Sequence, residues 1–146
     1  MTHDDIQSID EVRNQHLKVK ICVSGSADTA HLPPETLDIA KVLGEEIAGQ
    51  GAVLTTGATT GFPLWVAKAM KEAGGFSLGL SPAETEREHV DYYKLPLEYM
   101  DFIIYTGQGY AGRDILLTRT SDAIVVGPGR IGTFHEFTVA FEDHKP

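Results

Sequence analysis

Apolar residues occur in two different spacings along this chain. Short runs rich in β-branched and aromatic residues predict five strands, at residues 17–23, 52–55, 76–80, 102–105 and 123–126. Between these runs, apolar residues recur at the spacing of a helix face. This spacing predicts helices between Pro34 and Gly49, between Leu64 and Gly74, at residues 113–120, and from Thr133 to about Phe141. Residues 82–101 are acidic and rich in tyrosine instead, and we expect a long connection with about one helical turn there.

Strands that are continuously apolar and alternate with helices are typical of a parallel sheet covered on both faces. We therefore predict a single α/β domain over residues 17–146, a Rossmann-like three-layer sandwich with a mainly parallel sheet. Residues 1–16 are polar and charged, and we expect a flexible N-terminal segment. The last predicted helix is followed only by EDHKP, where an α/β domain normally returns to another strand, so we expect a domain that is short at its C-terminus.

Composition narrows the class of protein. The chain has 146 residues, of which 42% are hydrophobic and 23% charged, as is typical of an ordered globular domain. Its net charge of −9 argues against binding of a nucleic-acid backbone by bulk charge. Cys22 is the single cysteine and lies in an apolar run, so we expect a buried thiol without an internal disulfide. No run of about 18 apolar residues is present, and we predict a cytoplasmic protein that does not bind membranes.

Glycine clusters follow the predicted strands and indicate a ligand site. In an open parallel sheet the carboxyl ends of the strands share one edge, where a ligand crevice forms. Singly, each glycine is explained as a turn residue, but together the clusters favour a binding site, because glycine lets the backbone approach a ligand closely. From the loops after the first two strands we predict contacts by Gly25, Ser26, Gly57, Thr60 and Gly61.

The stretch from Asp122 to Glu136, DAIVVGPGRIGTFHE, predicts a strand, a glycine turn and a helix. The free N–H groups and the positive dipole end of such a helix favour an anion such as phosphate. We therefore predict a phosphate site made by the turn and the first helical residues, namely Gly129, Arg130, Ile131, Gly132 and Thr133.

Two charged residues near this turn are candidates for chemistry. Glu136 lies one helical turn beyond the predicted anion site, and it is either a functional carboxyl group or a solvated surface acid. Arg113 follows the glycine-rich loop at residues 107–112, and we interpret it as an anion anchor, with a surface arginine as the alternative.

Other nucleotide and metal motifs fit less well. Residues 107–112 and 127–132 both match G-x-G-x-x-G, but neither has the acid that a dinucleotide site needs at the end of the next strand, about 20 residues later. Gly127 to Thr133 lacks the lysine of a P-loop. His135 and Glu136 begin an H-E-x-x-H pattern, but Val139 stands at the second histidine position, so we predict no metal site.

The stretch from Pro128 to Glu136, PGRIGTFHE, resembles the P-G-G-x-G-T-x-x-E motif of the LOG (lonely-guy) family, the cytokinin riboside monophosphate phosphoribohydrolases. Residues 55–82 and 21–26 are similar to further segments of that family. Arg113 lies 23 positions before Glu136, where the family keeps its catalytic arginine. The resemblance implies catalysis by Arg113 and Glu136, a nucleoside 5′-monophosphate ligand, release of free base and ribose 5-phosphate, no metal or redox cofactor, and a homodimer.

Three departures from the motif keep a second interpretation open. Arg130 replaces the second glycine, and His135 stands where the enzymes commonly have another glutamate. The surroundings of Arg113, GYAGRDILL, differ from the family's histidine-glutamate-arginine-lysine pattern. The wider superfamily also contains nucleotide-sensing domains, DprA-type DNA-processing proteins and molybdenum-cofactor carriers. The alternative is therefore a protein that binds or carries a nucleotide or the molybdenum cofactor without catalysis.

Overall fold

Strands and helices alternate along residues 17–146, the part of the chain that the computed structural model describes. The elements are β1 (Lys20–Ser24), α2 (Glu35–Gly49), β2 (Val53–Thr56), α3 (Phe62–Glu72), β3 (Phe76–Ser81), α4 (Glu86–Asp91), β4 (Phe102–Tyr105), α5 (Gly109–Thr120), β5 (Ala123–Val126) and α6 (Ile131–Glu142). The expectation of a flexible segment at residues 1–16 lies outside the described residues.

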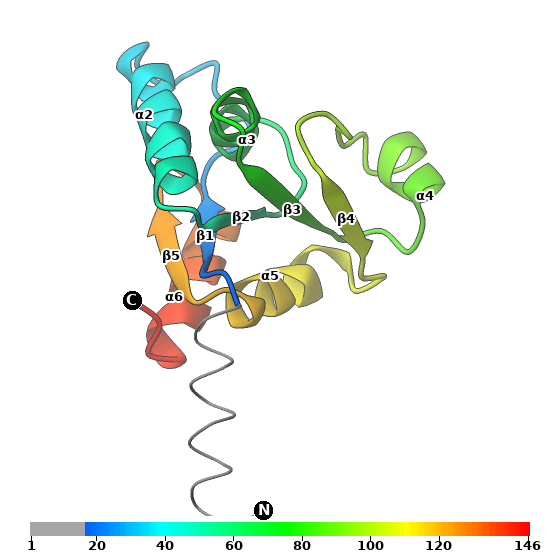
Figure 1. Ribbon diagram of the computed structural model, residues 1–146. Coiled ribbons are helices and arrows are strands. Elements are labelled where there is room, and N and C mark those ends of the chain that lie inside the picture. The colour runs from blue at the N-terminus through cyan, green and yellow to red at the C-terminus, as the bar shows by residue number, and fades with distance from the viewer. Residues whose placement is uncertain (1–16) are drawn as a thin grey trace, which may run out of the picture.

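The five strands form one sheet in the order β4-β3-β2-β1-β5, and every pairing is parallel. Helices α2 and α3 cover one face of this sheet, and α5 and α6 lie on the other (Figure 1). The predicted Rossmann-like three-layer class is therefore confirmed. Because all strands run in the same direction, their carboxyl ends meet at one edge.

A separate apolar core fills each side of the sheet, because successive side chains of a strand point to opposite faces. Val23 of β1 packs in one core with Phe62 of α3. Its neighbour Cys22 packs in the other core with Leu80 and Leu117. Cys22 is a free, fully buried thiol, and burial raises its pKa, so this cysteine is a core residue.

Several predicted boundaries need correction. Strands β4 and β5 have the predicted limits, whereas β1 begins at Lys20 and α6 begins at Ile131. The expected loop at residues 107–112 is largely helical, because α5 begins at Gly109. Glycine inside a helix costs only about 1 kcal/mol relative to alanine, so the packing of the buried part of α5 outweighs the poor helix signal of its first turn.

The sheet is not covered on both faces along its whole width. Phe102 and Ile104 of the edge strand β4 are 59% and 42% exposed, so the helices leave part of this strand uncovered. The long connection before β4 contains the expected short helix, α4. Thr85 caps this helix, and its Oγ1 accepts a hydrogen bond from the amide of Glu88 at 3.1 Å.

The residues after α6 lie along the free edge of β5. There the amide of Ile124 donates a hydrogen bond to the carbonyl of Pro146 at 2.9 Å. The expected shortness of the domain at this end stays a prediction. Over residues 17–146, no helix is long and apolar enough to cross a membrane.

Candidate functional site

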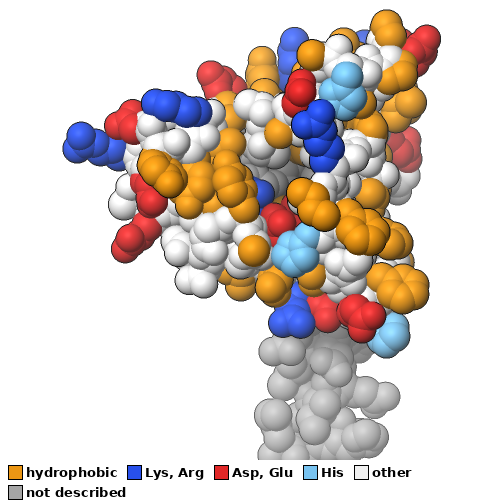
Figure 2. Space-filling view, turned by 180° about the vertical axis from the view of Figure 1, so that it is seen from behind, with side chains coloured by type: hydrophobic (Ala, Val, Ile, Leu, Met, Phe, Trp, Pro, Cys, Tyr) orange, Lys and Arg blue, Asp and Glu red, His pale blue; other side chains and the backbone are white. Residues whose placement is uncertain are grey.

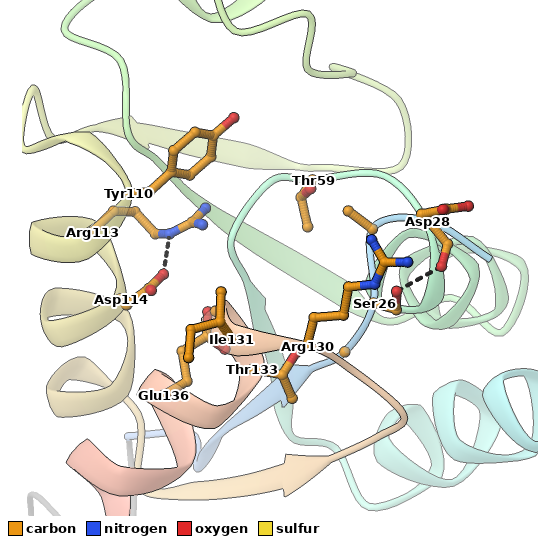
Figure 3. A pocket seen from close by; sticks show the side chains of 13 residues that line it. Ser26, Asp28, Thr59, Tyr110, Arg113, Asp114, Arg130, Ile131, Thr133 and Glu136 are labelled. Carbon is orange, nitrogen blue, oxygen red and sulfur yellow. Dashed lines mark hydrogen bonds and ion pairs between the residues drawn. The ribbon is translucent and has the colours of Figure 1, made fainter. Parts of the chain in front are cut away.

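A cavity of about 420 Å³ lies at the carboxyl edge of the sheet (Figure 3). Its walls come from the loops after β1, β2 and β5 and from the first turns of α5 and α6. The residues that line it are Gly25, Ser26, Ala27, Asp28, Thr59, Tyr110, Arg113, Asp114, Arg130, Ile131, Gly132, Thr133 and Glu136. In the space-filling view the molecule is hollowed near its centre, with apolar side chains on both sides of the hollow (Figure 2).

Backbone hydrogen bonds around Ser26 hold the loops of this edge together. The amide of Ser26 donates to the carbonyl of Pro128 at 2.6 Å, and its carbonyl accepts from the amide of Phe62 at 2.9 Å. The amide of Gly127 donates to the carbonyl of Ser24 at 2.8 Å. The loops after β1, β2 and β5 are therefore one connected unit.

Most of the predicted site residues line the cavity, and four of them do not. Those that line the cavity are Gly25, Ser26, Arg113, Arg130, Ile131, Gly132, Thr133 and Glu136. Gly57 accepts a hydrogen bond from Arg113 through its carbonyl, and Thr60 Oγ1 donates to the carbonyl of Ala27 at 3.0 Å. Gly129 packs against Thr133.

Two of the predicted glycines are required by packing within the protein. A Cβ atom at Gly25 would lie 2.6 Å from the ring of Phe62, which is buried beside the β1 loop. Gly61 has a φ of +79°, and a Cβ atom there would lie 2.1 Å from the carbonyl oxygen of Ser26. Their residue type is thus explained without a ligand.

The first turn of α6 faces the cavity. Arg130 is the N-cap residue, but no side-chain hydrogen bond caps the helix. The first amides of a helix lack partners within the helix, so this end is suited to an anion. A Cβ atom at Gly132 would meet nothing within 4 Å, so the approach to the backbone is open at this residue. The Arg130 side chain reaches across the cavity towards Ser26 and Asp28 (Figure 3).

Arg113 lines the cavity but has partners within the protein. It is only 5% exposed, and its Nε donates to Oδ1 of Asp114 at 3.0 Å. Its Nη1 donates to the carbonyl of Gly57 and, at 3.3 Å, to the carbonyl of Leu80. The interpretation of Arg113 as a surface arginine is therefore wrong. Its charge is balanced by Asp114 before any ligand binds.

Glu136 is a buried carboxyl group, so the alternative of a solvated surface acid is also wrong. It is 8% exposed. Its pKa is raised to about 8, mainly by burial; a hydrogen bond with Ser24 lowers the pKa, the nearby charge of Asp114 raises it, and the charge of Arg113 lowers it. The raised pKa favours the protonated form of Glu136 at neutral pH, with Ser24 and Asp114 as its hydrogen-bonding neighbours.

Several lining residues were not predicted from the sequence, and Asp114 and Tyr110 are the most important of them. Asp114 accepts from Arg113 and also pairs with Nδ1 of His135 at 3.0 Å. Tyr110 stands at the start of α5, within the expected loop. In the sequence, the only indication of this ion pair is that Asp114 directly follows Arg113 near the start of a helix. Within residues 17–146, no cluster of three or more metal-ligating side chains occurs.

The fold defines a Rossmann-like α/β domain with a cavity at the carboxyl edge of its sheet. More specifically, the chain belongs to the SLOG cluster4 family, whose model matches residues 18–146. An uncharacterized protein of Archaeoglobus fulgidus is 29% identical over 127 residues, which are 87% of this chain and 78% of that protein. The similarity to the LOG family therefore holds at the level of the SLOG superfamily.

Two solved structures are similar to this chain over most of its length. The molybdenum cofactor binding protein from the phototrophic bacterium Rippkaea orientalis gives a TM-score of 0.74 at 27% identity, covering 90% of this chain and 75% of that one. The Moco carrier protein from Chlamydomonas reinhardtii gives a TM-score of 0.74 at 30% identity, covering 89% of this chain and 74% of that one.

Proposed function

We propose that this protein binds and carries a phosphorylated heterocyclic cofactor of the molybdenum cofactor type, without cleaving it. The observation that carries the proposal is the open first turn of α6 in the wall of a cavity of about 420 Å³. Ligand pockets commonly have about 300–1,000 Å³, so the cavity has room for a phosphorylated pterin or a nucleotide. The similarity to molybdenum cofactor binding and carrier proteins supports this class of ligand.

In this proposal the phosphate of the ligand lies at the α6 N-terminus. Backbone amides of Ile131, Gly132 and Thr133 donate to its oxygens, with the helix dipole adding to the attraction. Arg130 reaches over the same space and supplies a charge-assisted contact. The molybdenum cofactor is a pterin with a dithiolene group and a terminal phosphate ester, so one end of it matches this anion site.

The charge state of the cavity also supports carriage over catalysis. An oxocarbenium-like transition state needs a negative charge nearby, and a protonated Glu136 does not provide one. Asp114 is engaged by Arg113 and His135. A neutral carboxyl group and a balanced ion pair instead suit a site that holds its ligand unchanged.

The direct test is co-elution of the purified protein with the molybdenum cofactor in gel filtration, with the bound pterin identified after its release. We expect intact cofactor in the protein fraction of the wild type. The amount of cofactor that co-elutes with Arg130→Gly should be lower by about 10-fold or more. Arg87→Gly is the matched control, because Arg87 lies on α4 with a highly exposed side chain. Cofactor that elutes separately from the wild-type protein would contradict the proposal.

Hydrolysis of a nucleoside 5′-monophosphate, as in the LOG family, is the second candidate. It is favoured by one observation, since a carboxyl group with a raised pKa beside an arginine suits a general acid. Glu136 would then protonate the leaving base. Incubation with a panel of nucleoside monophosphates tests this candidate by release of free base and ribose 5-phosphate. If turnover occurs, Glu136→Gln is expected to lower it by ~100-fold or more.

A further inference from the structure

Tyr110 is the one aromatic side chain among the cavity-lining residues in the described part of the chain. It belongs to the first turn of α5 and is 51% exposed. In Figure 3 its ring lies on the wall opposite Arg130, with the cavity between them. The cavity therefore has an anion-binding wall on α6 and an aromatic wall on α5.

The ring of Tyr110 is held in place by neighbours on two elements. The ring of Tyr93, from the connection before β4, packs edge-on against it with the centroids 5.2 Å apart and the planes at 87°. Tyr92 packs in the same way against Tyr93 at 4.9 Å. The guanidinium carbon of Arg113 lies 5.6 Å from the centroid of Tyr110. These contacts fix the ring before a ligand arrives, which reduces the entropy lost on binding.

A fixed aromatic ring opposite an anion site suits a ligand with two different ends. A planar heterocycle packed against the phenol ring would be separated from its phosphate by the width of the cavity. A phosphorylated ligand without a ring would leave the exposed part of Tyr110 unused. We propose that Tyr110 is the specificity-determining residue for the planar ring of the ligand, and that Tyr93 is its positioning residue. This inference rests on the anion site of the proposed function.

The test compares two probes that share a phosphate but differ in the ring. Guanosine 5′-monophosphate carries a 2-amino-oxo pyrimidine ring like that of a pterin, and ribose 5-phosphate carries no heterocycle. Both are titrated against wild type, Tyr110→Leu, Tyr110→Phe and Tyr93→Leu. Base stacking on aromatic side chains predicts that Tyr110→Leu weakens guanosine monophosphate binding by about 5- to 150-fold. Ribose 5-phosphate binding is expected to stay unchanged, and Tyr110→Phe is expected to bind both probes like wild type.

Tyr93→Leu distinguishes positioning from a purely structural role. We expect it to weaken binding of the ring-bearing probe only, and by less than Tyr110→Leu. Phe102→Leu is the matched control, because Phe102 is 59% exposed, does not line the cavity and is not part of this tyrosine cluster. Equal losses for both probes, or no loss in Tyr110→Leu, would overturn the inference while the anion site stands. If wild type binds neither probe, the proposed anion site itself fails.

Discussion

Asp114 and His135 join the two helices on one face of the sheet through a hydrogen bond of 3.0 Å between Oδ2 and Nδ1. Asp114 is 4% exposed, and its other oxygen accepts from Nε of Arg113 at 3.0 Å. One buried carboxylate on α5 thus both balances the arginine in the cavity and ties α5 to α6. Asp114 thus supplies one of the contacts that hold α6 next to Arg113.

Removing the negative charge of Asp114 should therefore destabilise the fold. In Asp114→Asn the buried Arg113 loses its counter-ion, and we expect a loss of about 3 kcal/mol in the free energy of unfolding. The matched control is Asp143→Asn, which weakens the pair with the exposed Arg119 and should lower the free energy of unfolding much less. Denaturant unfolding of both variants measures the difference. Equal losses in the free energy of unfolding would show that the Arg113–Asp114 pair stabilises the fold no more than the Arg119–Asp143 pair does.

The raised pKa of Glu136 predicts a particular dependence of stability on pH. The folded protein keeps this proton up to a pH of about 8, whereas the unfolded chain releases it near the ordinary value of 4.5. The stabilising contribution of the proton is thus fully present below pH 4.5 and is lost as the pH rises towards 8. Between pH 4.5 and 8 the free energy of unfolding should therefore fall by about 1 kcal/mol per pH unit.

The comparison of wild type with Glu136→Gln isolates this effect, because glutamine does not titrate. The difference in unfolding free energy between the two proteins should change steadily between pH 4.5 and 8. Three other carboxyl groups, those of Asp101, Asp122 and Asp143, have lowered pKa values. Their contributions to stability are lost only as the pH falls below the ordinary pKa of an aspartate. Parallel pH profiles for the two proteins would contradict a buried, protonated Glu136.

The sequence predicted the architecture well because strand pattern and glycine position are local signals. The limits of β4 and β5 and the meeting of several loops at one sheet edge follow from apolar runs that end in glycine. The partners of Arg113 could not be predicted in this way. Gly57 and Leu80 are brought to it by the register of β2 and β3, and their carbonyls carry no residue-specific signal.

Tyr110 illustrates a second limit of sequence patterns. The start of α5, GYAG, lacks helical periodicity, so its sequence predicts a loop and gives no direction for its side chains. Only the fold shows that the first turn points this ring into the cavity and that Tyr93 packs against it. Side-chain contacts between distant elements decide both features.

Two glycines with the same φ predict different costs of substitution. Gly61 and Gly74 both have a φ of +79°, so alanine at either position is expected to cost about 1 kcal/mol or more of backbone strain. A Cβ atom at Gly61 would also lie 2.1 Å from the carbonyl oxygen of Ser26, whereas nothing lies within 4 Å at Gly74. Gly61→Ala should therefore destabilise the protein clearly more than Gly74→Ala in thermal unfolding. Similar melting temperatures would mean that the loops after β1 and β2 separate easily.

The outer face of α6 predicts self-association. Phe134, Phe137 and Phe141 are 60%, 45% and 68% exposed, and successive rings lie 6.4 Å and 6.2 Å apart. We propose a homodimer through this aromatic row. Phe141→Asp should produce a monomer in light scattering at micromolar concentration, because it places a charge within the apolar contact. Val42→Asp, at a position of 64% exposure on α2, should leave the dimer intact. A monomeric wild type would contradict this proposal.

The most direct test of the central claim is whether the cavity recognises the phosphate of its ligand through the α6 N-terminus and Arg130. Calorimetric titration of guanosine 5′-monophosphate and guanosine into wild type and Arg130→Gly measures this. We predict that wild type binds the monophosphate at least ~10-fold more tightly than the nucleoside, and that Arg130→Gly weakens only the monophosphate, by about 10- to 100-fold. Equal affinities of wild type for the two ligands, or tighter binding by Arg130→Gly, would contradict the account.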